Sequence, residues 1–302
     1  MNLLVVARWT VLEARRRRLL AAGVALSVAF VALFALAFTL LYRSQGRSLL
    51  DAQAGGAGQG GLAGVVGPRE ELLVLSTGLV VLGLYGVQFL AALLALVLGV
   101  GAISPEVDSG ALHAVLARPL GRLDYLLGRF LALAGLLTAY VVVMAGSLLL
   151  VARTVAGYQA GNAARAVGLL VVEVLVLLAV SLLGSTVLPT LANGVVMVAL
   201  FGLAWLGGIV GFIGTVPPGN ELLANLGTAV SLLLPADAVW RGASFHALPA
   251  SLLAASSFAG GDDLTLPFAA TARIAPAMLA WAIAYPTACL GVAVAAFRRR
   301  DL

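Results

Sequence analysis

The chain contains no lysine, and it is poor in the residues that most enzymes use for catalysis. All eighteen basic residues are arginine, and there are only one cysteine, Cys289, and two histidines, His113 and His246. A phosphate-binding P-loop requires a lysine, so this polypeptide cannot form one. A single cysteine also excludes a disulfide within the chain.

Charged residues are scarce as well. They make up 10% of the 302 residues, whereas hydrophobic residues make up 62% and the mean hydropathy is +1.09. Soluble domains contain roughly 45–50% apolar residues. Several continuous apolar runs of about 20 residues each could cross a bilayer as helices, and they lack the alternation of barrel strands. The sequence therefore predicts an all-α integral membrane protein, a polytopic bundle of six transmembrane helices in a single domain over residues 1–302.

The expected spans follow the apolar runs, at about residues 19–41, 76–102, 130–152, 166–188, 195–213 and 274–297. Residues 1–18 are expected either to form an interfacial helix with Trp9 at headgroup level or to be a disordered basic tail. Residues 42–76 are expected to form an external loop and 189–194 a short inner turn. Residues 214–273 are expected to form an external segment, with an amphipathic helix over Leu222–Leu233 that ends at Pro235–Arg241.

Arginines flank the predicted bundle on one side. Arg15–Arg18 precede the first span and Arg298–Arg300 follow the last one. Positive residues concentrate in cytoplasmic segments, so we expect a cell-membrane protein with both termini in the cytoplasm. The same placement accounts for the net charge of +5 and the pI near 10.0 without nucleic acid as a partner.

The longest polar interruption on that side is the segment 103–129. Ser104 and Pro105 can start a helix, and Pro119 cannot continue one. Between them Leu112, Val115 and Leu116 recur on one helical stripe. The segment is predicted to hold a short, capped, amphipathic helix, and the alternative is an ordinary loop with an amphipathic turn.

The order of short motifs in this segment resembles the first cytoplasmic loop of type-2 ABC exporter permeases. An acidic residue is followed by SGAL, LARPLGR and YLLGRF. The loop is most similar to the subgroup containing the permease of the nitrous oxide reductase maturation transporter, although Ala111 stands where threonine is commoner. The resemblance implies a coupling helix that docks on a separate ATPase, and the positions assigned to coupling are Glu106, Gly110, Leu112, Val115, Leu116, Arg118, Pro119, Arg122, Gly128 and Arg129.

The same resemblance implies the partners. The chain would be a transporter permease rather than an enzyme, without a catalytic, metal or cofactor site of its own. ATP and magnesium would bind to a cytoplasmic ABC ATPase subunit, and the permease would pair with a second copy of itself or with a related permease in the lipid bilayer. No residue selects a cargo.

Among the ionisable residues of the sequence, Glu173 alone lies clearly inside a predicted span. Such a group is costly in lipid and must face the bundle interior, a partner or water. Glu173 either contacts a substrate or a proton, or it is a protonated or hydrogen-bonded residue that holds helices together near the outer interface. An alternative function is therefore a six-span secondary transporter or an intramembrane enzyme that uses Glu173, although G-x-S-x-G and H-E-x-x-H motifs and paired intramembrane carboxylates are missing.

Small residues mark the fifth span. Gly207 and Gly211 form a G-x-x-x-G face, which lets two helices approach closely. This face is either a homodimer seam or a site of packing within the chain.

Overall fold

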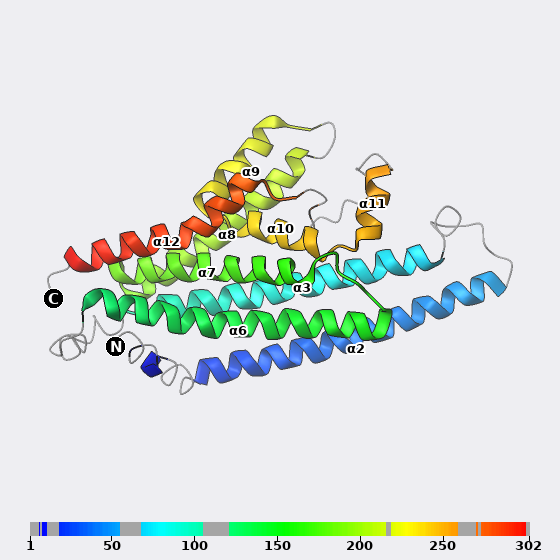
Figure 1. The fold of residues 1–302 in the computed structure, drawn as a ribbon, viewed down its shortest axis with the longest axis horizontal. Helices are drawn as coiled ribbons and strands as arrows, with labels where there is room; N and C mark the ends of the chain where they lie inside the picture. The colour runs from blue at the N-terminus through cyan, green and yellow to red at the C-terminus, as the bar shows by residue number, and fades with distance from the viewer. Residues whose placement is uncertain are drawn as a thin grey trace.

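The computed structural model of the protein is a bundle of helices (Figure 1). It describes residues 6, 8–10, 18–54, 68–104, 121–215, 219–258, 270 and 273–299, and no strand occurs among them. The helices of these ranges are α2 (Arg18–Ala54), α3 (Pro68–Val100), α6 (Arg122–Ala156), α7 (Ala163–Val187), α8 (Thr190–Thr215), α9 (Glu221–Leu233), α10 (Ala236–Ala247), α11 (Ala250–Phe258) and α12 (Pro276–Arg299).

Six of these helices are long and apolar enough to cross a membrane, which confirms the predicted fold class. The candidate spans are Gly23–Ser48, Arg69–Val100, Leu123–Ala156, Ala163–Val187, Thr190–Gly214 and Pro276–Arg299. Large apolar side chains such as Leu33, Val143 and Val198 are more than 60% exposed on the outside of the bundle. A lipid environment accounts for such a surface, because lipid surrounds the exposed side chains with apolar groups. In a soluble protein, only the core provides such surroundings.

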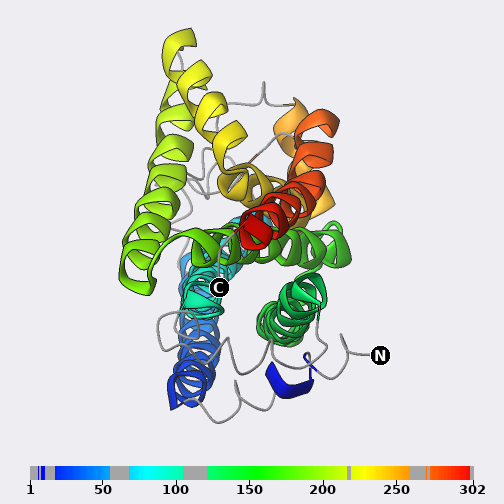
Figure 2. The same ribbon diagram turned by 90° about the vertical axis from the view of Figure 1, so that its left-hand side faces the viewer.

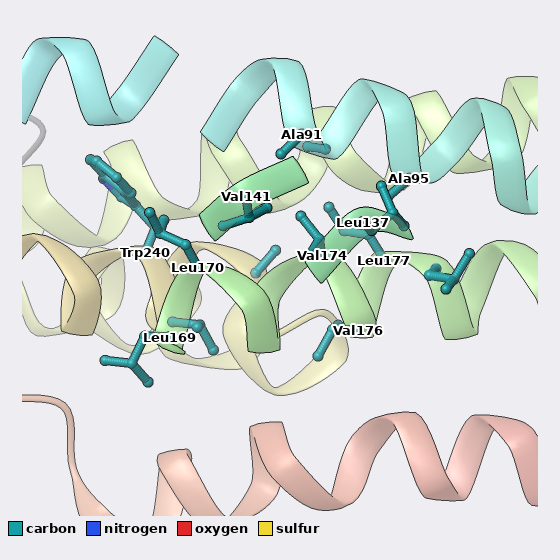
Figure 3. Close-up of a cluster of buried hydrophobic side chains, with 14 of the residues drawn as sticks. Ala91, Ala95, Leu137, Val141, Leu169, Leu170, Val174, Val176, Leu177 and Trp240 are labelled. Atoms are coloured by element: carbon teal, nitrogen blue, oxygen red, sulfur yellow. The ribbon is translucent and has the colours of Figure 1, made fainter. Parts of the chain in front are cut away.

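The central helix of the bundle is α7. It packs against α3, α6, α8, α10 and α12. Figure 3 shows its residues Leu170, Val174 and Leu177 among buried side chains from the neighbouring helices. A helix that is apolar on nearly all sides can be surrounded by lipid or by other helices, and here it is the neighbouring helices that bury it.

Local signals fix the ends of α6 and α7. Gly157 ends α6 in the left-handed conformation, with φ of 63°. A side chain is disfavoured there, so glycine suits this position. Asn162 then starts α7, because its side chain accepts a hydrogen bond from the backbone N–H of Arg165 at 2.9 Å.

The first two spans extend further than predicted. Residues 42–54 and 68–76 were expected in an external loop, but they belong to α2 and α3. A drop in hydropathy shows where a helix leaves the lipid, but it does not show where the helix ends. Leucine, arginine and glutamine in these segments favour helix in water as well. The third span also starts earlier than predicted, at Leu123, and the expected inner turn at 189–194 is wrong because α8 already begins at Thr190.

The segment 214–273 also differs from its prediction. The predicted helix over Leu222–Leu233 exists as α9, but Pro235–Arg241 do not end the helical region. The chain bends by 102° and continues as α10, and together the two helices are apolar enough for a broken span or a re-entrant loop.

One end of the bundle, here called the loop end, carries the predicted coupling segment. There α3 ends, α6 begins and α12 ends, on the left in Figure 1. In Figure 2, seen from this end, α8 and α9 lie side by side at the edge of the bundle, where α8 also packs against α3, α7 and α10. Of the predicted interfacial helix at 1–18, the structure describes residues 6, 8–10 and 18, all in helical conformation.

Candidate functional site

Most of the predicted coupling segment lies outside the described residues. This holds for Glu106, Gly110, Leu112, Val115, Leu116, Arg118 and Pro119. The described residues nearest to them are Ser104 on one side and Gly121 on the other. The structure therefore places the two attachments of the segment to the bundle.

The first attachment is Ser104. Its hydroxyl lies within hydrogen-bonding distance of two backbone carbonyls, Ser185 O at 2.9 Å and Leu188 O at 3.0 Å. The last carbonyls of a helix have no partner within it, so a side-chain donor at this point satisfies the end of α7. Ser104 is 1% exposed. The start of the segment is thus fastened to the junction between α7 and α8.

The second attachment lies at the start of α6. Arg122 begins this helix, and Gly128 and Arg129 are both buried about two turns later. Arg129 donates through Nη1 to the Tyr125 hydroxyl at 3.2 Å, and its guanidinium lies 5.8 Å from the centre of the Tyr125 ring. That ring stacks on Phe297 of α12, with 6.3 Å between centroids. The end of the segment is thus packed against the last helix.

Helices α3, α7 and α8 approach one another closely at the loop end. A side chain at Gly99 of α3 would clash with Ser181 of α7, and one at Gly184 of α7 would clash with Asn193 of α8. The Asn193 amide also donates to the Ser181 carbonyl at 3.0 Å. Small residues let the three helices approach so closely that they hold one another in place. Ser104 is thus attached to the part of the bundle where α3, α7 and α8 pack closely together.

A second group of polar residues lies in the middle of the bundle. Glu173 is the eleventh of the 25 residues of α7, about 15 Å along the helix from its first residue. It therefore lies near the middle of α7. Its Oε1 accepts a hydrogen bond from Gln88 Nε2 of α3 at 2.6 Å.

Next to this pair, α10 brings a carboxylate and a guanidinium into the bundle. Arg241 Nε contacts Asp237 Oδ2 at 2.7 Å, and its Nη2 donates to the Gly208 carbonyl of α8. A Cβ at Gly208 would collide with the Asp237 carboxylate. Glycine at this position therefore makes room for the ion pair that holds α10 against α8.

Aromatic residues complete this polar layer. Trp205 of α8 donates its indole N–H to the Tyr85 hydroxyl of α3, and the Tyr85 ring packs edge-on against Trp240 of α10 at 5.2 Å. The predicted site residues did not include Tyr85, Gln88 or the Asp237–Arg241 pair. The i,i+4 spacing of Asp237 and Arg241 is a signal for the pair, but only the fold brings it beside α8.

The glycine face of α8 packs within the chain. A Cβ at Gly227 of α9 would lie 2.5 Å from the Gly211 Cα, and one at Gly207 would lie 2.5 Å from Val230 Cγ1. The backbones of α8 and α9 are therefore in direct contact along this face. Of the two alternatives for Gly207 and Gly211, the structure gives packing within the chain, since α9 covers the face.

The bend between α9 and α10 is also supported by side chains. The indole N–H of Trp281 donates to Leu232 O at 3.0 Å, and the Tyr285 hydroxyl donates to Leu233 O at 2.6 Å. Both donors come from α12. The carbonyls that lose their helical partners at the bend are thus satisfied.

Among the described residues, no group of three or more His, Cys, Asp or Glu side chains is placed to hold a metal ion. Two features therefore stand out. The helices contact one another closely at the loop end, and a layer of polar residues lies in the middle of the bundle. Such a structure can bind a polar group or pass on a movement.

Comparison with known proteins agrees with this architecture. The family model described as "ABC-2 family transporter protein" matches residues 9–302. No curated protein matches the chain significantly. The family match does not distinguish subgroups, so the narrower resemblance to the nitrous oxide reductase maturation permease stays a prediction. This multi-pass membrane protein belongs to the ABC-2 family of transporter proteins.

Proposed function

We propose that the chain is the transmembrane permease subunit of an ATP-binding-cassette transporter and is driven by a separate cytoplasmic ATPase. The observation that carries this proposal is the family match over residues 9–302. ATP and magnesium would bind to the ATPase, because a chain without lysine cannot form a P-loop. Family membership also favours a permease over the alternatives of a secondary transporter or an intramembrane enzyme.

The coupling route we propose runs through the segment 105–120. When the ATPase binds and releases ATP, it would shift this segment, whose ends are Ser104 and Gly121. Ser104 is hydrogen-bonded to the α7–α8 junction, and the start of α6 packs through Tyr125 on Phe297 of α12. A movement of the segment would therefore be passed to α7, α8 and α12. The segment needs only to bind the ATPase differently in two states of the bundle.

The orientation we propose places the loop end and both termini in the cytoplasm of the cell. Eleven of the eighteen arginines then lie on the cytoplasmic side, as the positive-inside rule favours. A second copy or a related permease would complete the transporter. This partner would bind away from Gly207 and Gly211, because α9 occupies that face.

Co-purification with an ABC ATPase, taken from the genes that neighbour this one, tests the proposal. We expect a tagged chain to retain the ATPase, and Leu112→Asp and Glu106→Ala to release it or to uncouple its hydrolysis from the permease. His113→Asp is the matched control, because helical spacing puts His113 off the stripe of Leu112 and Leu116. The proposal is wrong if no ATPase is retained, or if His113→Asp is as damaging as Leu112→Asp.

A further inference from the structure

The pair formed by Gln88 and Glu173 leaves two oxygens without a donor. Gln88 is 8% exposed and Glu173 is 1% exposed, and one hydrogen bond, Nε2 to Oε1 at 2.6 Å, joins them. Gln88 Oε1 and Glu173 Oε2 are buried and have no hydrogen-bond partner in the described part of the chain. A buried acceptor without a donor destabilises the fold, and a charged one does so more strongly. The pair as it stands therefore needs one more donor.

The neighbouring charged groups do not supply it. The Asp237 carboxylate acts electrostatically on Glu173 from α10, and two like charges at close range disfavour each other's ionisation. Arg241, the nearest cation on α10, is engaged with Asp237 and with the Gly208 carbonyl. From α3, the Tyr85 hydroxyl is the titratable group that interacts with Glu173. In the described residues, no ion pair compensates a charge on Glu173.

We propose that Glu173 and Gln88 form a proton-binding site. A proton on Glu173 Oε2, donated to Gln88 Oε1, would give both free oxygens a partner and remove the charge. A carboxylic acid and a primary amide can form such a ring of two hydrogen bonds, N–H to C=O and O–H to C=O. One proton thus satisfies both atoms. When it leaves, Glu173 becomes a carboxylate and both oxygens lose their partner again.

The site links the two helices that lead toward the loop end. Gln88 lies on α3 about three turns before the end of this helix, which leads to Ser104 and the segment 105–120. Glu173 lies on α7, which ends at the carbonyls that Ser104 contacts. Occupancy by the proton would set how firmly α3 is held to α7. This proposal concerns the bundle alone and does not depend on an ATPase partner.

Infrared difference spectroscopy on the protein in lipid nanodiscs tests the site. At mildly alkaline pH, where carboxyl groups in water are ionised, the wild-type protein should keep one protonated-carboxyl C=O band that shifts in D2O. Glu173→Gln should remove this band. Asp237→Asn should keep it, and Gln88→Leu should move it to higher frequency because its hydrogen bond is lost.

Two outcomes would overturn the proposal. The first is a wild-type minus Glu173→Gln spectrum that contains only carboxylate bands at neutral pH. The second is a carboxylate band that responds to sodium at constant pH, which would indicate a metal-cation site.

Thermal unfolding in the same nanodiscs gives an independent result. Glu173→Gln keeps a neutral pair with two hydrogen bonds and should match the wild-type midpoint, whereas Gln88→Leu should lower it. An equal loss in both variants would also contradict the ring.

Discussion

Ser104 closes the end of another helix: its hydroxyl lies 3.0 Å from the carbonyl of Leu188, the residue that caps α7. The two residues are far apart in the sequence, yet this contact ties the start of the segment 105–120 to the α7–α8 junction. The chain is therefore anchored to the core of the bundle at Ser104, directly before this segment begins.

Replacing Ser104 by alanine should weaken this anchor. Two backbone carbonyls, Ser185 O and Leu188 O, would lose their shared donor at a buried position. We expect a loss of about 1–3 kcal/mol of unfolding free energy, measured by thermal or denaturant unfolding in nanodiscs. Ser76→Ala is the control, since Ser76 is equally buried but bonds only to Leu73 of its own helix. Equal losses in the two variants would show that the hydrogen bonds of Ser104 to α7 and Leu188 add no stability beyond that of a hydrogen bond within one helix.

The crossing of α8 and α9 should not tolerate even a methyl group. A Cβ at Gly227 would lie 2.5 Å from the Gly211 Cα, a backbone atom that cannot rotate away. We expect Gly227→Ala to cost about 1–3 kcal/mol through overpacking. Gly202→Ala in α8 is the matched control because nothing lies within 4 Å of its added Cβ. A thermal midpoint that drops for Gly202→Ala as much as for Gly227→Ala would refute the contact.

The ion pair on α10 should stabilise its contact with α8. Arg241→Met would leave the Asp237 carboxylate without its cation and the Gly208 carbonyl without its donor. We expect a cost of about 1–3 kcal/mol, less than for a fully buried pair because Arg241 is 30% exposed. The double variant with Asp237→Asn should be less destabilised than the sum of the single ones. Strict additivity in this cycle would mean that the two side chains do not interact.

The aromatic contact between α6 and α12 can be measured in the same way. Tyr125 and Phe297 stack at 6.3 Å, so a double-mutant cycle of Tyr125→Leu and Phe297→Leu should give an interaction energy of about 0.5–1.5 kcal/mol. In the complex with the ATPase, both single variants should also reduce coupling. An interaction energy of zero would mean that the stacking of Tyr125 on Phe297 does not link the start of α6 to α12.

Hydropathy alone predicts much of this fold. Runs of apolar residues predict the six spans because lipid requires about 20 of them per helix, and the glycines of α8 are recognisable as a packing face. The ends of α2 and α3 could not be found in this way, since these helices continue into water. The course of α9 and α10 could not be found either, because Pro235 is compatible both with the end of a helix and with a bend.

The polar layer shows the limit of prediction for the site. Glu173 stands out in the sequence because it interrupts an apolar run, and the structure places it in the bundle interior. Gln88 carries no such signal, since a neutral amide in a span costs less than a charge. Its pairing with Glu173 depends on how α3 and α7 are aligned, and no local pattern encodes that alignment.

The central position of α7 divides the molecule by stiffness. The helices α3, α6, α10 and α12 all pack against α7, whereas α2 packs against α3 and α6, and α9 packs mainly against α8. A rotation of any inner helix must therefore move its neighbours with it, and α8 is held by α3, α7 and α10 as well as by α9, whereas α2 packs against α3 and α6 alone among the main contacts. The lipid around this protein should accordingly be disturbed mainly along α2, where fewer contacts oppose a change of shape.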